Sequence, residues 1–125
     1  MKKLLLPIKP CYVSKIIDGS KRVEYRKSIA SDRTVRQVLI YATRPVMRVV
    51  AEFTIEDFFE MTPEQLWIET SDIGGISKEK YMEYFSGHEV ARAYKISAVR
   101  LIEPNRTLKE YGINYVPQNF CYVND

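Results

Sequence analysis

The chain has 125 residues, of which 46% are hydrophobic and 28% charged. This is the composition of a folded globular domain and excludes a disordered or fibrous protein. No apolar run approaches the roughly 20 residues needed to span a bilayer. The apolar opening, which ends at Lys9-Pro10, is too short for a secretion signal. We therefore expect a single domain over 1–125, located in the cytoplasm and without a membrane partner.

Two cysteines, Cys11 and Cys121, lie near opposite ends of the sequence. Two thiols make no disulfide framework, and neither lies in a metal-binding spacing. We expect both to be small buried hydrophobic residues, and we expect no metal and no organic cofactor.

The net charge of +3 conceals a strong asymmetry along the chain. Residues 1–50 contain 12 Lys and Arg against 3 Asp and Glu, whereas residues 51–90 contain 2 against 10. In a compact domain, a basic first half can form a positive surface that attracts phosphate groups. Nucleic acid is therefore one candidate partner, and a merely solvated charged surface is the alternative.

The first half of the chain predicts a strand, a helix and three further strands. Pro10 suits the first turn of the helix, and Gly19 suits the left-handed position that follows its end. The last strand alternates, with Met47, Val49, Ala51, Phe53 and Ile55 expected to face inward and Glu52 outward. The predicted elements are a strand at 4–8, a helix at 10–18, and strands at 22–26, 38–42 and 47–56. The strand at 38–42 is apolar throughout, so we expect it to be covered on both faces.

The second half predicts two helices followed by a long strand. Thr62 is placed to cap a helix that runs to about Thr70, and Ser77 to cap a second helix that ends before Gly87. Residues 91–102 read as a strand whose alternation slips near Ala98, as a β-bulge would cause. A helical turn at 108–110 and an extended tail complete the chain. This order predicts an α+β fold in which short helices decorate a small mixed β-barrel.

The segment from Asp18 to Arg26 is the most informative for function. It places five charged residues within nine positions, at a predicted helix-to-strand junction. Glu24 and Arg26 are two residues apart on a strand, so they project from the same face, and Lys21 lies at the turn that enters the strand. Such a face can line a ligand cleft or form a surface row of ion pairs. The single histidine, His88, follows a predicted helix end, where a capping role explains it better than catalysis.

The pattern Gly19-x-Lys21-x-x-Glu24-x-Arg26, placed after a helix and before a strand, resembles the signature of ASCH domains of the PUA-like superfamily. The opening strand and the central apolar strands at 38–42 and 49–53 are similar to those of the family. The segment Pro117-Gln118-Asn119-Phe120 is similar to the tail of small stand-alone members described as transcriptional regulators. The resemblance implies a small β-barrel with a cleft that holds the motif residues.

The resemblance also implies a ligand: RNA, another single-stranded nucleic acid or a modified nucleotide. Arg26 can place its two-pronged guanidinium on a phosphate or a base edge, Glu24 can accept from an exocyclic amine, and Lys21 can meet a phosphate as a point charge. Further candidates near the same mouth are Lys9, Tyr41 and Arg44. Tyr41 can stack a base there, but a place in the core or on the strand surface is the favoured explanation for it.

One branch of the family, the acetylcytidine amidohydrolases, resembles this chain in the same motif but carries threonine at the position of Glu24. A carboxylate does not replace that hydroxyl nucleophile, although Glu24 and Lys21 can act on water as an acid–base pair. An amidohydrolase acting on an acylated nucleoside is thus the alternative to a binding domain. A third possibility is a protein-interaction domain that uses the acidic segment 52–89, and no specific motif in that segment supports it.

Overall fold

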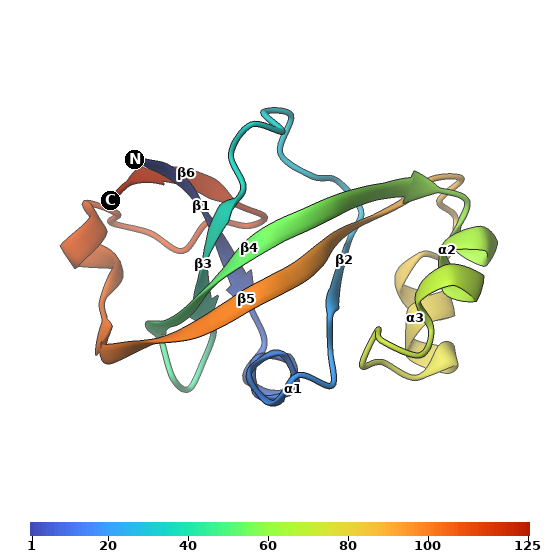
Figure 1. The fold of residues 1–125 in the computed structure, drawn as a ribbon, viewed down its shortest axis with the longest axis horizontal. Coiled ribbons are helices and arrows are strands. Elements are labelled where there is room, and N and C mark those ends of the chain that lie inside the picture. The colour runs from blue at the N-terminus through green and yellow to red at the C-terminus, as the bar shows by residue number, and fades with distance from the viewer.

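A six-stranded mixed sheet forms the body of the structure (Figure 1). The computed structural model describes residues 1–125. Its elements are β1 (Lys2–Ile8), α1 (Pro10–Asp18), β2 (Val23–Arg26), β3 (Gln37–Ala42), β4 (Arg48–Met61), α2 (Pro63–Thr70), α3 (Lys78–Tyr84), β5 (Ala91–Arg106), the 3₁₀ turn η1 (Leu108–Tyr111) and β6 (Cys121–Asn124). The strand order is β2-β5-β4-β3-β1-β6, and β1 and β3 are the one parallel pair.

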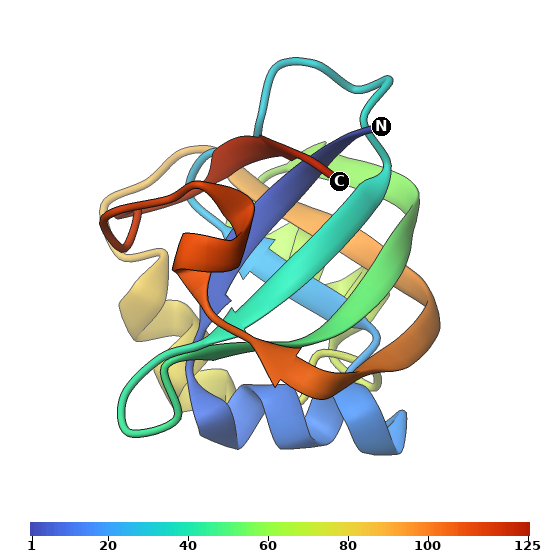
Figure 2. The same cartoon turned by 90° about the vertical axis from the view of Figure 1, so that its left-hand side faces the viewer.

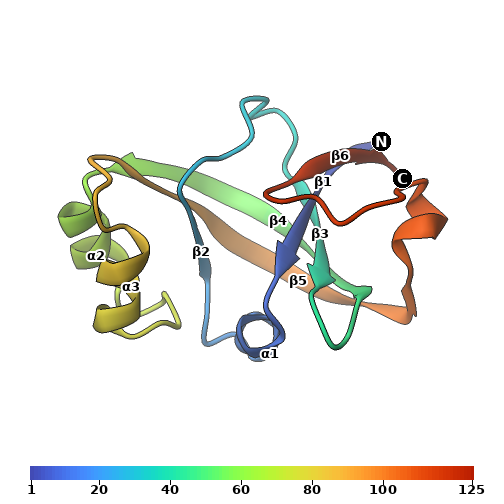
Figure 3. The same ribbon diagram turned by 180° about the vertical axis from the view of Figure 1, so that it is seen from behind.

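The sheet curls into a barrel-like shape, and β1, β3, β4 and β5 wrap around a common interior (Figure 2). Its edges are β2 and β6, which are not neighbours in the sheet. The α+β fold with a small, helix-decorated, barrel-like mixed sheet is therefore confirmed. Helix α1 lies between the end of β1 and the start of β2, and α2 and α3 lie where β4 ends and β5 begins (Figures 1 and 3).

The core lies on both faces of the central strand β3. Val38 and Ile40 point into the largest hydrophobic cluster, together with Ile16 of α1. Leu39 and Tyr41 point to the other face, into a second cluster. The expectation that this strand is covered on both sides is thus confirmed. A third cluster joins β2 to α2 and α3 and consists of Val23, Tyr25, Leu66, Tyr81, Phe85, Ala91 and Ala93.

The local start and stop signals act as predicted. Gly19 has a φ of 86° directly after α1, and the side chains of Thr62 and Ser77 accept hydrogen bonds from the first turns of α2 and α3. The predicted bulge also lies at Ala98, because Glu52 pairs with Arg100 whereas Thr54 pairs with Ser97. No helix in the structure has the length and apolar character needed to cross a membrane.

Strand β4 departs from the predicted alternation in two ways. Met47 is 41% exposed in the turn before the strand, and a register shift at Val50 moves Val49 to the second cluster, away from Ala51. Glu52, predicted to face outward, is 6% exposed. Its carboxylate is paired with Lys3 at 3.1 Å and Arg100 at 2.7 Å, and these cations make burial of its charge tolerable.

The strand also extends five residues beyond the predicted end, to Met61, because β5 pairs with it along this whole length. Of the two cysteines, Cys121 is half-buried. Cys11 is exposed on α1, so the expectation that both are buried is wrong.

Candidate functional site

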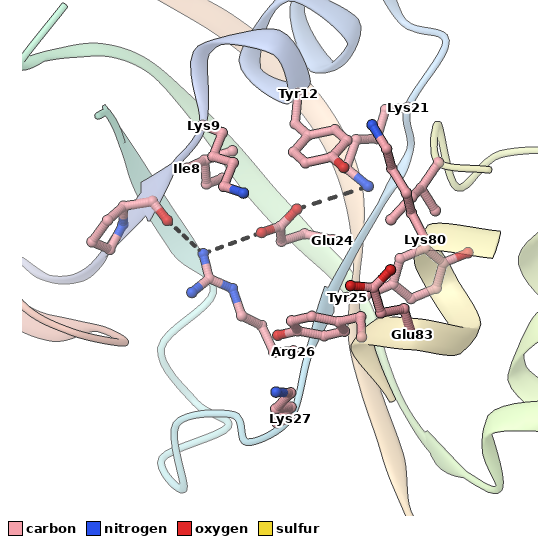
Figure 4. Close-up of a pocket in the computed structure, with 13 residues that line it drawn as sticks. Ile8, Lys9, Tyr12, Lys21, Glu24, Tyr25, Arg26, Lys27, Lys80 and Glu83 are labelled. Carbon is pink, nitrogen blue, oxygen red and sulfur yellow. Dashed lines mark hydrogen bonds and ion pairs between the residues drawn. The ribbon is translucent and has the colours of Figure 1, made fainter. Parts of the chain in front are cut away.

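A cavity of about 630 Å³ opens between the end of β1, helix α1, strand β2 and helix α3 (Figure 4). This volume is typical of small-ligand sites. Five positively charged side chains and two carboxylates line it. The lining residues are Pro7, Ile8, Lys9, Tyr12, Lys21, Glu24, Tyr25, Arg26, Lys27, Ile76, Lys80, Glu83 and Tyr84.

The turn between α1 and β2 positions the motif. Helix α1 ends at Gly19, and the Asp18 carboxylate accepts from the backbone N–H of Ser20 at 2.8 Å. The chain then enters β2, where successive side chains alternate between the two faces. Glu24 and Arg26 therefore point into the cavity, whereas Val23 packs in the core.

Lys21 is a buried cation at the back of the cavity, with 2% of its surface exposed. Its ammonium donates to the carbonyl of Gly74 at 2.6 Å and lies 5.3 and 5.0 Å from the ring centroids of Tyr12 and Tyr25. The carboxylate of Glu24 is 3.8 Å away. Burial lowers the pKa of Lys21, and the charge of Glu24 opposes that shift.

Arg26 is held on several sides. Its Nη2 donates to the carbonyl of Pro7 at 2.8 Å and is 3.1 Å from Glu24 Oε2, and its Nη1 donates to the backbone and side-chain oxygens of Asn119, each at 3.3 Å. Its Nε is buried without a hydrogen-bond partner. Glu24 thus lies between Lys21 and Arg26 (Figure 4), and Arg26 positions this carboxylate rather than offering a free fork to a phosphate.

The rim of the cavity carries the accessible charge. Lys9, Lys27 and Lys80 line the cavity and are exposed, and they come from three different parts of the chain. Glu83 is an exposed carboxylate on the same rim, so the rim keeps a net positive charge. The Lys27 ammonium lies 4.8 Å from the ring centroid of Tyr84. Burial raises the pKa of the Tyr84 phenol, which therefore stays protonated at neutral pH.

The structure brings Lys9, Lys21, Glu24 and Arg26 into one cavity, but it does not bring Tyr41 or Arg44 there. Tyr41 is 2% exposed and packs with Leu39 in the second cluster, because alternation along β3 directs it to that face. It has no free face on which a base could stack. Arg44 is exposed in the turn after β3 and does not line the cavity.

Several features of the site were missed from the sequence, among them Lys27, which directly follows Arg26 at the end of β2. Lys80 and Tyr84 are four residues apart and so share one face of α3, but only the tertiary packing brings that face to β2. Asn119 belongs to the tail segment noted above, and its contact with Arg26 spans 93 residues. Gly74 and Gly75 belong to no phosphate-binding motif, yet the backbone of this glycine pair packs against Lys21.

No family model matches the chain. It is 30% identical over 118 residues to a protein of Zymomonas mobilis named "ASCH domain-containing ribonuclease", a match that covers 93% of this chain and 80% of the relative. The crystal structure of ASCH from Zymomonas mobilis superposes with a TM-score of 0.90 at 28% identity, over 98% of this chain and 87% of that one. The chain is also 29% identical over 106 residues to a large ribosomal subunit protein uL22 of Ureaplasma parvum. That match covers 85% of this chain and 34% of the relative.

Proposed function

Because the chain belongs to the ASCH domain family, we propose that it binds RNA and holds one nucleotide in the cavity built on Lys21, Glu24 and Arg26. The observation that carries this proposal is the arrangement of charge in the cavity. Fixed, mutually paired charges form its floor, and three exposed lysines with one exposed carboxylate, Glu83, form its rim. The relative named a ribonuclease supports RNA as the ligand.

The rim supplies the contacts to the RNA backbone. Lys9, Lys27 and Lys80 are long, flexible and accessible, so each can meet a phosphate as a point charge. Each phosphate contact releases counterions, so for a single strand each contact lowers the logarithm of the binding constant by about 0.7 for every tenfold increase in salt concentration. Three such contacts give a slope of about −2.

The inner groups are suited to the nucleoside part of the ligand. Glu24 has one oxygen turned to Arg26 and the other 3.8 Å from Lys21, so its remaining acceptor capacity faces the cavity. An exocyclic amine of a base or a ribose hydroxyl can donate to it.

RNA cleavage is the second candidate, favoured by the name of the relative and by the pairing of a carboxylate with a buried lysine. In such a reaction the ribose 2′-oxygen attacks the adjoining phosphorus and loses its proton to Glu24. The bond from phosphorus to the 5′-oxygen breaks, and Lys21 gives that oxygen a proton. The products are a 2′,3′-cyclic phosphate and a 5′-hydroxyl. Burial lowers the pKa of Lys21, which makes its ammonium a stronger acid than that of an exposed lysine and so favours this proton transfer.

Binding is tested by titrating a labelled single-stranded RNA with wild-type protein and single-lysine variants, at several salt concentrations between about 50 and 200 mM. Lys9→Ala and Lys80→Ala should each weaken binding and reduce the salt slope by about 0.7. The matched control is Lys109→Ala, an exposed lysine of η1 outside the cavity, which should leave both quantities unchanged. Wild-type protein that binds no RNA refutes the proposal.

Cleavage is tested on the same samples with RNA, with DNA of the same sequence and with an acylated cytidine. Cleavage of RNA but not DNA, abolished by Glu24→Gln, supports the 2′-hydroxyl reaction, because DNA lacks the attacking oxygen. Release of the acyl group from the nucleoside instead supports the amidohydrolase alternative. Binding without either turnover leaves an RNA-binding domain.

A further inference from the structure

Tyr84, at the last turn of α3, is an aromatic side chain that lines the cavity while remaining accessible. It is 36% exposed, whereas its neighbours Tyr81 and Phe85 are 0% and 2% exposed. Its ring meets the edge of Phe85 with centroids 4.8 Å apart and planes at 72°. Because Phe85 is fixed in the core, this contact holds the Tyr84 ring in place.

Lys27 occupies one face of this ring. Its ammonium lies 4.8 Å from the ring centroid, and its side chain is otherwise exposed to solvent. Contacts between a cation and a ring are weak at exposed sites, and the lysine stem is flexible. A planar ligand can therefore take the place of the ammonium, which remains close enough to meet a negative group attached to that ligand.

We propose that Tyr84 is a stacking platform for an unpaired nucleobase, and that Lys27 moves from the ring to the adjoining phosphate when RNA binds. The inference rests on the proposed RNA binding and narrows the ligand to single-stranded RNA. Bases within a duplex are covered by their neighbours on both faces, whereas a base in a single strand can leave the stack and lie on an aromatic ring. In this proposal the base stacks on Tyr84 of α3 and not on Tyr41, which lies outside the cavity.

Charge supports a nucleotide over a neutral aromatic ligand as the occupant. The rim beside Tyr84 carries Lys27 and Lys80 against one carboxylate, Glu83, and Lys9, which directly follows β1, adds a third cation to the cavity. A ligand that places a flat ring on Tyr84 and a phosphate between these lysines satisfies both features. The simpler explanation, that Tyr84 only shields Phe85 from solvent, predicts a change in stability and no change in binding.

The experiment uses the full chain and a short single-stranded RNA that contains one 2-aminopurine, a base whose fluorescence is quenched when it stacks. Wild-type protein should quench it, and Tyr84→Phe should do so equally because the ring is kept. Tyr84→Leu should abolish the quenching and weaken binding by about 5- to 150-fold. The matched control is Tyr115→Leu, which removes a tyrosine that is 67% exposed and lies outside the cavity.

Lys27→Ala separates the two halves of the inference. It should keep the quenching, because the platform remains, and reduce the salt slope by about 0.7, because one phosphate contact is lost. Circular dichroism of each variant verifies that it is folded.

RNA that binds the wild type but is bound equally well and quenched equally by Tyr84→Leu overturns the stacking platform and leaves RNA binding intact. Loss of quenching in Lys27→Ala overturns the proposed movement of the lysine. Wild-type protein that binds duplex RNA as tightly as single-stranded RNA overturns the restriction to unpaired bases. If the wild type binds neither, the proposed function itself fails.

Discussion

Replacing Gly74 by alanine tests how tightly the loop between α2 and α3 packs behind the cavity. A Cβ atom at this position would overlap the hydroxyl oxygen of Tyr25 and lie 2.9 Å from its Cε2. Tyr25 is buried, and its hydroxyl is 2.7 Å from Oγ1 of Thr70. The added methyl group must therefore displace either the ring or the loop that holds Lys21 through the Gly74 carbonyl.

The expected cost follows from these two contacts. Overpacking a core by one methyl group costs roughly 1–3 kcal/mol, and separating a buried hydroxyl from its partner costs roughly 1–3 kcal/mol more. Gly74→Ala should thus lower the free energy of unfolding by about 2–6 kcal/mol. Removing the hydroxyl with Tyr25→Phe relieves the worst overlap, so Gly74→Ala should cost at least about 1 kcal/mol less in that background.

Urea unfolding measures these values, with the single Trp67 as a local probe because its ring lies 4.8 Å from that of Tyr81. The control is Gly87→Ala, where the added Cβ meets nothing within 4 Å and only the positive φ of 79° is strained. That control should cost about 1–2 kcal/mol in either background. Equal costs of Gly74→Ala with and without the Tyr25 hydroxyl would show that the loop relaxes freely, and would refute the reasoning.

Three further outcomes are expected. Glu52→Ala should lower the free energy of unfolding by roughly 3 kcal/mol, because it leaves the buried Lys3 with fewer partners. In the same urea titrations the control Glu56→Ala should cost less than about 1 kcal/mol, because Glu56 belongs to an exposed ion pair. The hydrogen bond from Lys3 lowers the pKa of Asp125. This pair therefore stabilises the fold fully at pH values above the ordinary pKa of 3.8, and the stabilisation is lost as the pH falls through the lowered pKa. In an acid titration of stability, Asp125→Asn should lack this loss. Burial lowers the pKa of Lys21, so between that lowered pKa and pH 10.5 the unfolded chain binds more protons than the folded chain. In this range the free energy of unfolding of the wild type should rise with pH relative to that of Lys21→Met. A wild-type value that falls relative to the variant would contradict the argument.

The placement of the motif could be predicted from the sequence because short-range rules determine it. The ends of α1 follow from Pro10 and Gly19, and the alternation of β2 directs Glu24 and Arg26 to one face. These rules act over a few residues and need no knowledge of distant partners. The convergence of Lys21, Glu24 and Arg26 is the result.

The rest of the site depends on contacts between distant segments, which the sequence does not encode locally. Nothing around Tyr84 shows that α3 lies beside β2, and nothing around Asn119 shows that it reaches Arg26. The sequence also does not show to which face of β3 Tyr41 points, because a strand that is apolar throughout has no alternation of apolar and polar residues. The alternation of its strand predicts that Glu52 faces solvent, and the partner that allows its burial, Lys3, is 49 residues away and leaves no local signal.

The pairing of β1 with β6 also has a kinetic consequence. Leu5 lies opposite Cys121, so this ladder joins residues that are more than a hundred positions apart. Closing so long a loop is entropically costly, and such non-local pairing slows folding. Strand β6 contributes four residues, so we expect it to dock late, on a sheet that is already formed. Since Asn119 lies just before β6 and contacts Arg26, the cavity would reach its final shape only in this last step of folding.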